Sequence, residues 1–293
     1  MPLVGSAGHV DHGKSTLIRA ITGRDPDRWA EEKRRGLTID LGFAWTTLPD
    51  GTEISFVDVP GHERFLKNML AGIEAIDVAL FVVAADEGWM PQSEEHLAVL
   101  DLLEVRRGVV ALTKVDLVEP DLIEVAIAET EERLIGTSLE NVSIVPVSAI
   151  SGTGMPELVD SIAGLLPGAA ASDGRPRLWV DRSFPMAGAG TIVTGTLLGA
   201  PLAVEEKVEI YPTGRVARVR GLQSHESSHR TIGPGRRVAL NLGGIDHREV
   251  ARGHMVGMPG HWRTSSRFTA SITKARFVDE MNLRGAYQLH IGS

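Results

Sequence analysis

The sequence predicts an α/β domain with a mostly parallel sheet, followed by a β-barrel domain and the beginning of another β domain. Three observations lead to this fold class. Strand-like and helix-like segments alternate in the first half, short β-branched runs begin near residue 177, and little sequence is left after residue 262. A chain of 293 residues with 43% hydrophobic and 23% charged residues is long enough for about two packed domains.

The first half combines apolar runs typical of buried strands with segments of helical period. We expect strands at 3–7, 54–59, 78–84, 109–112 and 143–147, and helices near 14–22, 63–75, 93–104, 120–135 and 155–166. Such βα repetition favours a mostly parallel sheet. The small, polar, proline-bounded stretch PGAAASDGRP then predicts a boundary, with one domain over 1–170 and a linker over 171–176.

The second half consists of short runs separated by Gly or Pro turns. The runs lie at 191–198, 207–211, 217–222 and 237–242, with no helical segment of any length between them. This pattern is typical of a small β-barrel, which we place at 177–262. Residues 263–293 also read as strands but are too few to close another core, so they predict a partial third β-barrel.

Bulk properties exclude several classes of protein. No apolar run reaches the ~18 residues of a membrane span, so we expect a cytoplasmic protein without membrane binding. We also expect a monomer. The absence of cysteine excludes disulfides, thiol catalysis and cysteine zinc sites. The net charge of −8 argues against a simple basic nucleic-acid binder. Residues 175–293 nevertheless carry 17 Lys+Arg against 9 Asp+Glu, which either faces RNA phosphates or is ordinary surface variation.

A phosphate-binding loop is predicted between the first strand and the first helix, where GHVDHGKS at 8–15 matches GxxxxGK[ST]. Backbone N–H groups of the loop and of the helix N-terminus can surround a β-phosphate. Lys14 can reach the β and γ oxygens, and the Ser15 hydroxyl can ligate Mg²⁺. The predicted nucleotide contacts here are Asp11, His12, Gly13, Lys14, Ser15 and Thr16.

Three further elements complete a guanine nucleotide site. In DVPGH, Asp58 at a strand end can reach Mg²⁺, usually through water, and Gly61 can offer its N–H to a γ-phosphate. In TKVD, Asp116 can accept two hydrogen bonds from guanine, while the Lys114 stem packs over the ring at the carboxyl edge of the sheet. After the strand that ends at residue 147, the backbone amides of Ser148 and Ala149 could contact guanine O6.

The ordered set GHVDHGKS, RGLTID, DVPGH, TKVD and SA resembles the translational GTPases of the elongation factor Tu group. The resemblance implies GTP or GDP with Mg²⁺ as cofactors, and slow intrinsic hydrolysis that awaits an activator supplied in trans. The family usually has Asn where TKVD has Thr113, so one orienting hydrogen bond is changed. Guanine selectivity should survive, since Asp116 supplies the discriminating contacts.

The same resemblance assigns the switch residues. Thr38 in RGLTID would be a second hydroxyl ligand of Mg²⁺, made only when a γ-phosphate is present. His62 stands where the family orients the attacking water, so it is the candidate catalytic residue. Val10 and Leu37 would form an apolar gate that keeps His62 from the γ-phosphate, or they are simply core residues; both readings stay open.

Within the group, residues 27–43 and 188–196 resemble the bacterial selenocysteine-specific elongation factors more than elongation factor Tu. These factors carry selenocysteyl-tRNA to the ribosome and hydrolyse GTP on delivery. Asp181, Arg182 and Arg237 match the family's aminoacyl pocket, whose basic side chains suit an ionised selenol. The family continues through a complete third domain and modules that bind the messenger hairpin. We therefore expect a chain truncated within its third domain, without hairpin binding.

Three alternatives remain open. The chain could be another tRNA-carrying GTPase, such as elongation factor Tu or the initiation factor gamma subunit, and aminoacyl specificity would distinguish these. It could be a P-loop kinase or ATPase, although TKVD and SA argue against this, and competition by GDP but not ADP would decide. It could also be a GTP-gated RNA carrier with incidental hydrolysis, which single-turnover assays with and without ribosomes would test.

Overall fold

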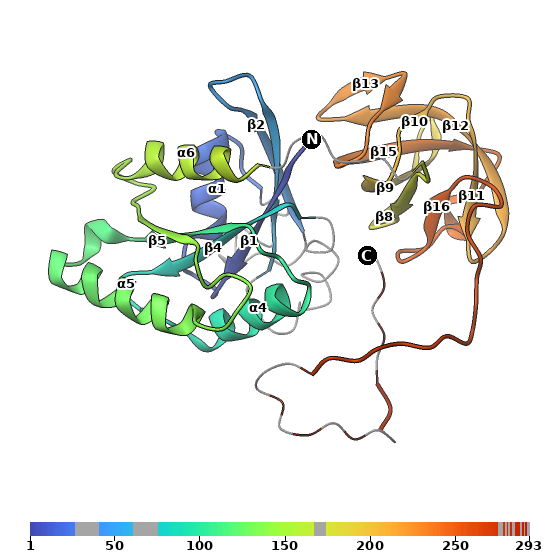
Figure 1. Cartoon of the computed structure of the whole chain (residues 1–293). Helices are drawn as coiled ribbons and strands as arrows, with labels where there is room; N and C mark the ends of the chain where they lie inside the picture. Colours follow the sequence, from blue (N-terminus) through green and yellow to red (C-terminus); the bar gives the residue numbers. More distant parts are fainter. Residues whose placement is uncertain are drawn as a thin grey trace. The chain divides into compact units, whose positions relative to one another are not determined.

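The computed structural model describes residues 1–26, 41–60, 76–166 and 174–274, together with residues 278, 280, 282, 285–287, 289 and 291. The chain divides into two compact units, whose main parts are Pro2–Pro167 and Gly168–Ile272 (Figure 1). Each unit has a hydrophobic core of its own. The domain limits predicted from the sequence stay predictions.

The first unit is built on a six-stranded sheet in the order β2-β3-β1-β4-β5-β6. Its strands are β1 (Leu3–Gly8), β2 (Gly42–Thr47), β3 (Glu53–Asp58), β4 (Val78–Ala84), β5 (Gly108–Thr113) and β6 (Ser143–Pro146). Neighbouring strands are parallel except at the edge, where β2 pairs antiparallel with β3. The mostly parallel sheet predicted from the sequence is confirmed.

The helices of this unit begin where local sequence favours a start. They are α1 (Lys14–Thr22), α4 (Pro91–Leu102), α5 (Pro120–Leu134) and α6 (Met155–Leu165), with a short 3-10 turn η2 (Val115–Leu117). Proline lies in the first turn of α4, α5 and α6, where its missing N–H costs no helical hydrogen bond. The helix predicted at 63–75 lies outside the described residues.

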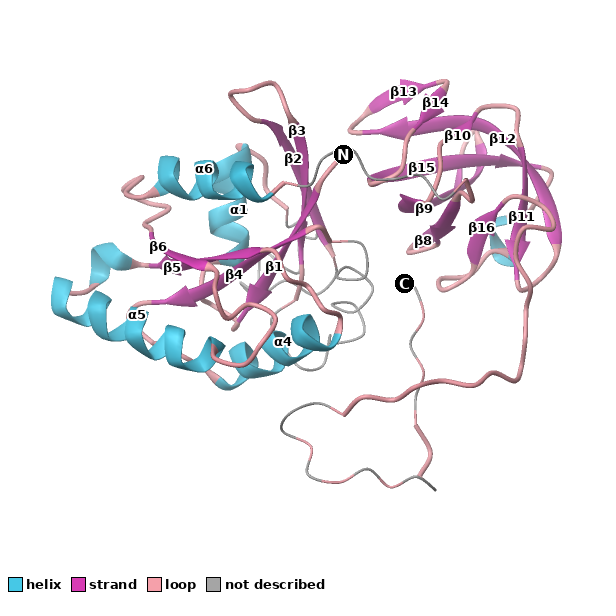
Figure 2. Cartoon of the chain, viewed as in Figure 1, coloured by secondary structure: helices cyan, strands magenta, loops and turns pink. Residues whose placement is uncertain are grey.

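The helices cover both faces of the sheet (Figure 2). On one face Leu97 of α4 and Leu134 of α5 share a buried cluster with Phe81. On the other, Leu17 of α1 and Leu158 of α6 share a cluster with Phe56. Every residue of β1, β4 and β5 is buried, as expected for parallel strands covered on both sides. Burying each large side chain contributes about 2–3 kcal/mol before entropy is counted.

The carboxyl ends of the parallel strands meet at one edge of the sheet, which is where open α/β sheets bind ligands. β1 leads into the phosphate loop, β3 ends at Asp58, and β5 ends at Thr113. The loop after β4 and the loop after β6 open at the same edge. The topology therefore gathers segments that are far apart in the sequence.

The second unit is a small antiparallel β-barrel. Its strands are β7 (Arg177–Trp179), β8 (Arg182–Met186), β9 (Gly190–Leu198), β10 (Leu202–Ala203), β11 (Lys207–Tyr211), β12 (Arg215–Ser224), β13 (Ser227–His229), β14 (Thr231–Ile232), β15 (Arg236–Gly243) and β16 (Met255–Gly257). The order β11-β16-β7-β9-β15-β12 closes on itself, because β11 also pairs with β12. Closure leaves no open edge in this ring, so the predicted barrel is confirmed.

The only helical element assigned among the described residues of this unit is the single turn η3 (His247–Glu249). After β16, the described residues of the chain form no helix or strand. The predicted beginning of a third barrel therefore stays a prediction. In the described part of the chain, no helix is both long enough and apolar enough to span a membrane.

Candidate nucleotide site

The phosphate loop connects β1 to α1 through two residues with left-handed backbone, Asp11 at φ 64° and Gly13 at φ 88°. Among the described residues, no side chain caps the start of α1 at Gly13, and its first turn holds no acidic residue. Such a helix end is suited to an anion, because its first N–H groups lack helical partners. His12 is buried in the loop, whereas Asp11 and Thr16 are exposed. The loop therefore has the cradle that a phosphate group requires.

The Lys14 side chain lies inside this loop. Only 6% of the residue is exposed, and its Nζ donates to the carbonyl oxygens of Gly8 at 3.1 Å and His9 at 2.5 Å. These bonds hold the ammonium group at the concave side of the loop rather than in bulk water. The position fits the predicted role of a cation that meets β and γ oxygens.

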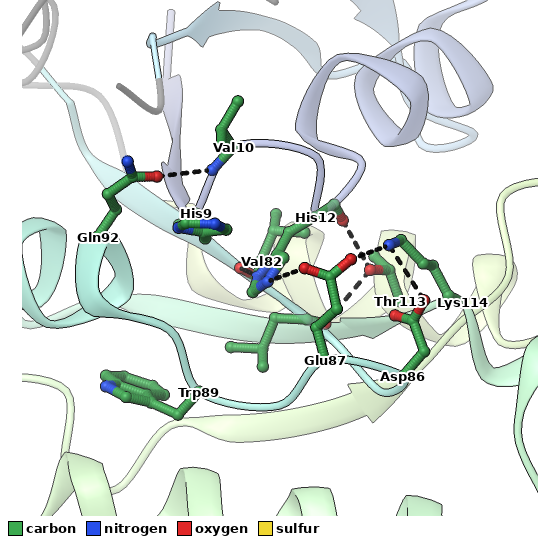
Figure 3. Close-up of polar contacts among 12 residues, drawn as sticks. His9, Val10, His12, Val82, Asp86, Glu87, Trp89, Gln92, Thr113 and Lys114 are labelled. Carbon is green, nitrogen blue, oxygen red and sulfur yellow. Dashed lines mark hydrogen bonds and ion pairs between the residues drawn. The ribbon is translucent and has the colours of Figure 1, made fainter. Parts of the chain in front are cut away.

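Helix α4 fixes the backbone of the loop from the side. Nδ1 of His96 accepts a hydrogen bond from the Gly8 N–H at 2.9 Å. Oε1 of Gln92 accepts one from the Val10 N–H at 3.2 Å (Figure 3). The sequence analysis predicted this helix but missed both residues, since each acts more than 80 positions away from its partner. The only available signal was a polar side chain at a helix position that faces the sheet.

Oxygen ligands for a divalent cation meet at the ends of β1, β3 and α1. The buried Asp58 accepts from the Ser15 hydroxyl at 2.5 Å and from the Ser6 hydroxyl at 2.7 Å. Ser6 in turn accepts the N–H of Val59 at 3.1 Å, which orients the carboxylate. A hydroxyl and a carboxylate are hard ligands of the kind that Mg²⁺ prefers, so the residues fit that ion.

The TKVD segment is tied to the phosphate loop. The Thr113 hydroxyl donates to the His12 carbonyl oxygen at 2.7 Å, so threonine makes a link across the site in the position where the family usually has Asn. Lys114 has a left-handed backbone at φ 60°, and its Nζ lies 2.9 Å from Glu87 and 3.3 Å from Asp86. Burial alone would lower the pKa of Lys114, but hydrogen bonds to these two carboxylates outweigh it and raise the pKa. Lys114 is therefore held as a cation.

The base-contacting groups lie on the loops after β5 and β6. Asp116 is exposed in η2, so its carboxylate is accessible to a ligand. The Ser148 hydroxyl accepts the N–H groups of Ile150 and Ser151, which shapes the loop. The Ser148 N–H itself donates to Thr153 O at 3.0 Å, so the prediction that it contacts guanine O6 conflicts with this bond. The amide of Ala149 is the remaining donor, and among the described residues it has no hydrogen-bond partner.

The predicted switch residues Thr38, Gly61 and His62, and the gate residue Leu37, lie outside the described residues. Their assignments therefore stay predictions. The structure does bring the phosphate loop, Asp58, TKVD and the Ser148 loop to one edge of the sheet. That arrangement can hold a phosphate chain at one end and a purine base at the other.

The second unit contains the predicted aminoacyl pocket residues. Nε and Nη2 of Arg237 lie 3.1 and 2.9 Å from the two carboxylate oxygens of Asp181, and Thr194 contacts both side chains. Arg182 begins β8 and is paired in register with Thr194 of β9. The three predicted residues therefore lie around the same strand, β9, which pairs with β8 on one side and with β15 on the other. The structure adds Thr194, which the sequence analysis missed.

The buried histidines of the site should make stability depend on pH. Burial lowers the pKa of His96 to about 3, so the unfolded chain binds a proton at pH 5 that the folded chain does not. Stability should fall as pH drops from about 6.5 toward 3, with about 2 kcal/mol lost at pH 5 through this residue. In His96→Gln, which keeps an acceptor for Gly8, urea unfolding at pH 7 and pH 5 should differ by less. An unchanged difference would contradict this assignment.

Comparison with known proteins identifies the first unit. Residues 1–168 match the family described as the elongation factor Tu GTP binding domain. The chain is similar to the selenocysteine-specific elongation factor of Desulfomicrobium baculatum, with 48% identity over 88% of this chain and 41% of the relative. The corresponding factor of Escherichia coli (strain K12) is 42% identical over 84% of this chain and 40% of the relative. The chain thus spans about two fifths of the length of these curated relatives.

A second group of relatives matches less closely. Translation initiation factor 2 subunit gamma of Thermococcus kodakarensis is 36% identical over 87% of this chain and 68% of the relative. The comparison with solved structures gives the same result as the closer sequence relatives. A bacterial selenocysteine-specific elongation factor has a TM-score of 0.84 and 40% identity, over 88% of this chain and 45% of that one. Elongation factor SelB of Methanococcus maripaludis, in complex with a GTP analogue, has a TM-score of 0.79 and 30% identity, over 88% and 54%.

These likenesses confirm the resemblance predicted from the sequence motifs. They cover the α/β unit and extend into the barrel, since 88% of the chain aligns with the solved factors. The family match spans the strands and loops that build the nucleotide site. The chain therefore belongs to the family of the elongation factor Tu GTP binding domain, the translational GTPases.

Proposed function

We propose that this chain is part of a GTP-dependent elongation factor that carries selenocysteyl-tRNA to the ribosome in the cytoplasm. It binds GTP or GDP with Mg²⁺, acts as a monomer, and hydrolyses GTP to GDP and phosphate on delivery. One observation carries the nucleotide half of the proposal: four loops with complementary chemistry lie at one edge of the sheet. The identity of 48% to a selenocysteine-specific factor supports the tRNA half.

In this proposal the residues at the phosphate end bind and orient the nucleotide. Ser15 and Asp58 hold Mg²⁺, joined by Thr38 when a γ-phosphate is present, and Lys14 neutralises phosphate charge from inside the loop. When bound, Mg²⁺ supplies compensation for the charge that develops on the phosphate oxygens. Positioning and charge stabilisation are the main contributions a protein makes to phosphoryl transfer, so these contacts suffice for slow intrinsic hydrolysis.

At the base end, Asp116 selects guanine. Its carboxylate accepts hydrogen bonds from N1–H and the exocyclic amine, a pair of donors that adenine does not present together. The Ala149 amide donates to O6, and the Lys114 stem covers the ring. This donor and acceptor pattern argues against the kinase or ATPase alternative.

The barrel supplies the proposed aminoacyl pocket. Arg237 is already paired with Asp181 in a bidentate contact, so these two side chains together contribute no net charge. Arg182, at the start of β8, is the other basic side chain of the proposed pocket. A partly desolvated cation would favour the selenolate over the neutral hydroxyl of serine.

The competing function is that of an initiator-tRNA carrier. The 36% identity to initiation factor 2 subunit gamma supports this alternative. Protection of the tRNA ester bond against hydrolysis distinguishes the two. The chain is mixed with GTP or GDP and with selenocysteyl-, seryl- or initiator methionyl-tRNA. GTP-dependent protection of the selenocysteyl species alone supports our proposal. Preferential protection of initiator tRNA would support the alternative, and equal protection would reject the charge-based pocket.

His62→Ala tests the proposed hydrolytic role. The variant should bind GTP as the parent chain does, because His62 would orient water rather than nucleotide. Ribosome-stimulated hydrolysis should fall about 10²-fold, the order expected when a reactant is misplaced by about 1 Å. Single-turnover release of phosphate measures the effect, in a version of the protein extended to the full length of its relatives if the chain alone is not stimulated. Unchanged stimulated turnover would reject the role.

A further inference from the structure

The turn between β4 and α4 places a carboxylate between the two halves of the nucleotide site. Glu87 Oε1 accepts a hydrogen bond from Lys114 Nζ at 2.9 Å, and its Oε2 lies 3.7 Å from Nε2 of His12 (Figure 3). Lys114 belongs to the base-recognition segment and His12 to the phosphate loop. Neither the sequence motifs nor the functions assigned above give Glu87 a role.

The backbone that carries Glu87 is held firmly in place. The N–H groups of Glu87 and Gly88 both donate to the Ala84 carbonyl at the end of β4. Two residues further along, the backbone N–H of Trp89 donates to Glu129 of α5 at 3.3 Å, and the Trp89 ring stacks on Phe81 with ring centroids 5.4 Å apart. A carboxylate on such a fixed turn loses only side-chain entropy, and no further backbone entropy, when it binds a partner. It can therefore serve as an anchor for mobile side chains.

Lys114 is the side chain that needs an anchor. A lysine stem has four rotatable bonds, so packing it over a base is entropically costly unless its ammonium group is fixed. Its Nζ is bound by two carboxylates, at 2.9 Å from Glu87 and 3.3 Å from Asp86. The hydrogen bond with Lys114 lowers the pKa of Glu87, so the carboxylate is ionised at neutral pH. The pair is thus a charge-assisted contact.

Only one of the two carboxylates also faces the phosphate loop. The side chain of His12 is fully buried, its Nδ1 lies 3.4 Å from the Val82 carbonyl, and its own carbonyl accepts from Thr113. Burial lowers the pKa of His12 to about 4, so the ring against which Glu87 rests is neutral. The Glu87 carboxylate consequently has a fixed, uncharged surface on one side and the Lys114 ammonium on the other. Asp86 contacts Lys114 without such a support among the described residues.

We propose that Glu87 is a positioning residue for nucleotide binding: braced against His12 of the phosphate loop, it holds Lys114 in the orientation that covers the purine ring. The inference rests on the nucleotide site of the proposed function and names a residue that acts through Lys114. It makes Glu87 more important than Asp86, although both carboxylates contact the same ammonium group. Its effect is on how long the nucleotide stays bound, and it acts equally on di- and triphosphates.

The test is the dissociation rate of fluorescent GDP and GTP from the intact chain and its variants. Glu87→Gln should speed dissociation about fivefold for both nucleotides, the modest factor expected for a partly exposed charge-assisted contact. Asp86→Asn should change the rate by less. Glu104→Gln is the matched control, because Glu104 is paired with Arg106 at 3.1 Å but both side chains are about three-quarters exposed and belong to the opposite edge of the sheet. It should leave the rate unchanged.

Two readouts separate positioning from a merely structural effect. In a Lys114→Met background, the additional substitution Glu87→Gln should change the rate by less than about twofold, because the group it positions is gone. Inosine diphosphate lacks the exocyclic amine but keeps the ring face that the Lys114 stem contacts. Glu87→Gln should therefore speed its dissociation by the same factor as that of GDP. A fivefold effect that persists without Lys114 would overturn the inference, and so would an unchanged rate in Glu87→Gln. Failure of the parent chain to bind guanine nucleotides would instead reject the proposed function.

Discussion

Replacing Asp116 by asparagine is expected to reverse the base preference of the chain from guanine to xanthine. The affinity for GDP should fall about 10³-fold, because two hydrogen bonds to an ionised acceptor are lost together and the new amide N–H₂ opposes the guanine donors. Xanthosine diphosphate carries a carbonyl where guanine carries the exocyclic amine. The asparagine amide can donate to that oxygen, so the variant should bind it more tightly than GDP.

The Asp116→Asn substitution should affect ligand binding without affecting the packing of the protein. Asp116 is exposed in η2, outside the hydrophobic core, so the substitution should not affect folding. Asp121→Asn, in the first turn of α5 a few residues away, is the matched control for loss of one negative charge. Competition binding with GDP, xanthosine diphosphate and ADP measures the preference. Equal loss for GDP and xanthosine diphosphate would mean that Asp116 is not the base-selecting group.

The sequence predicted the α/β unit well because its signals are local. Continuous apolar runs predicted β1, β4 and β5, and these strands differ from the predicted limits by at most one residue at either end. Proline and glycine marked the helix starts and ends. Each of these features acts within a few positions of the chain, so periodicity and turn chemistry suffice to find it.

The contacts that fix the site could not be found in the same way. His96, Gln92 and Glu87 hold the phosphate loop and Lys114 from positions that only the tertiary fold brings near. The use of the Ser148 N–H within its own loop likewise depends on how the turn to Thr153 closes. Residues that contact a ligand occur at characteristic spacings in the sequence, because the shape of the ligand restricts where they can lie. Residues that only orient those groups occur at no characteristic spacing, so a sequence motif does not identify them.

Arg237→Ala is expected to destabilise the barrel by about 3 kcal/mol. The Arg237 and Asp181 side chains are only 17% and 11% exposed, so the substitution leaves a largely desolvated carboxylate without its bidentate partner. Removing one member of a buried ion pair typically costs 3–5 kcal/mol, and the remaining exposure places this site at the low end. The expected loss is far larger than that of the matched control Arg218→Ala. Arg218 and Glu205 are 55% and 63% exposed, and such surface pairs contribute at most about 1 kcal/mol.

Urea unfolding followed by tryptophan fluorescence measures both variants, since Trp179 and Trp262 report from the second unit. The double variant Asp181→Asn with Arg237→Ala should recover part of the loss, because it removes the uncompensated charge. Such recovery would identify the pair as a neutral scaffold of the proposed pocket. If Arg237→Ala were as mild as Arg218→Ala, the guanidinium would not be committed to Asp181, and Arg237 itself would be available to bind an anionic selenol.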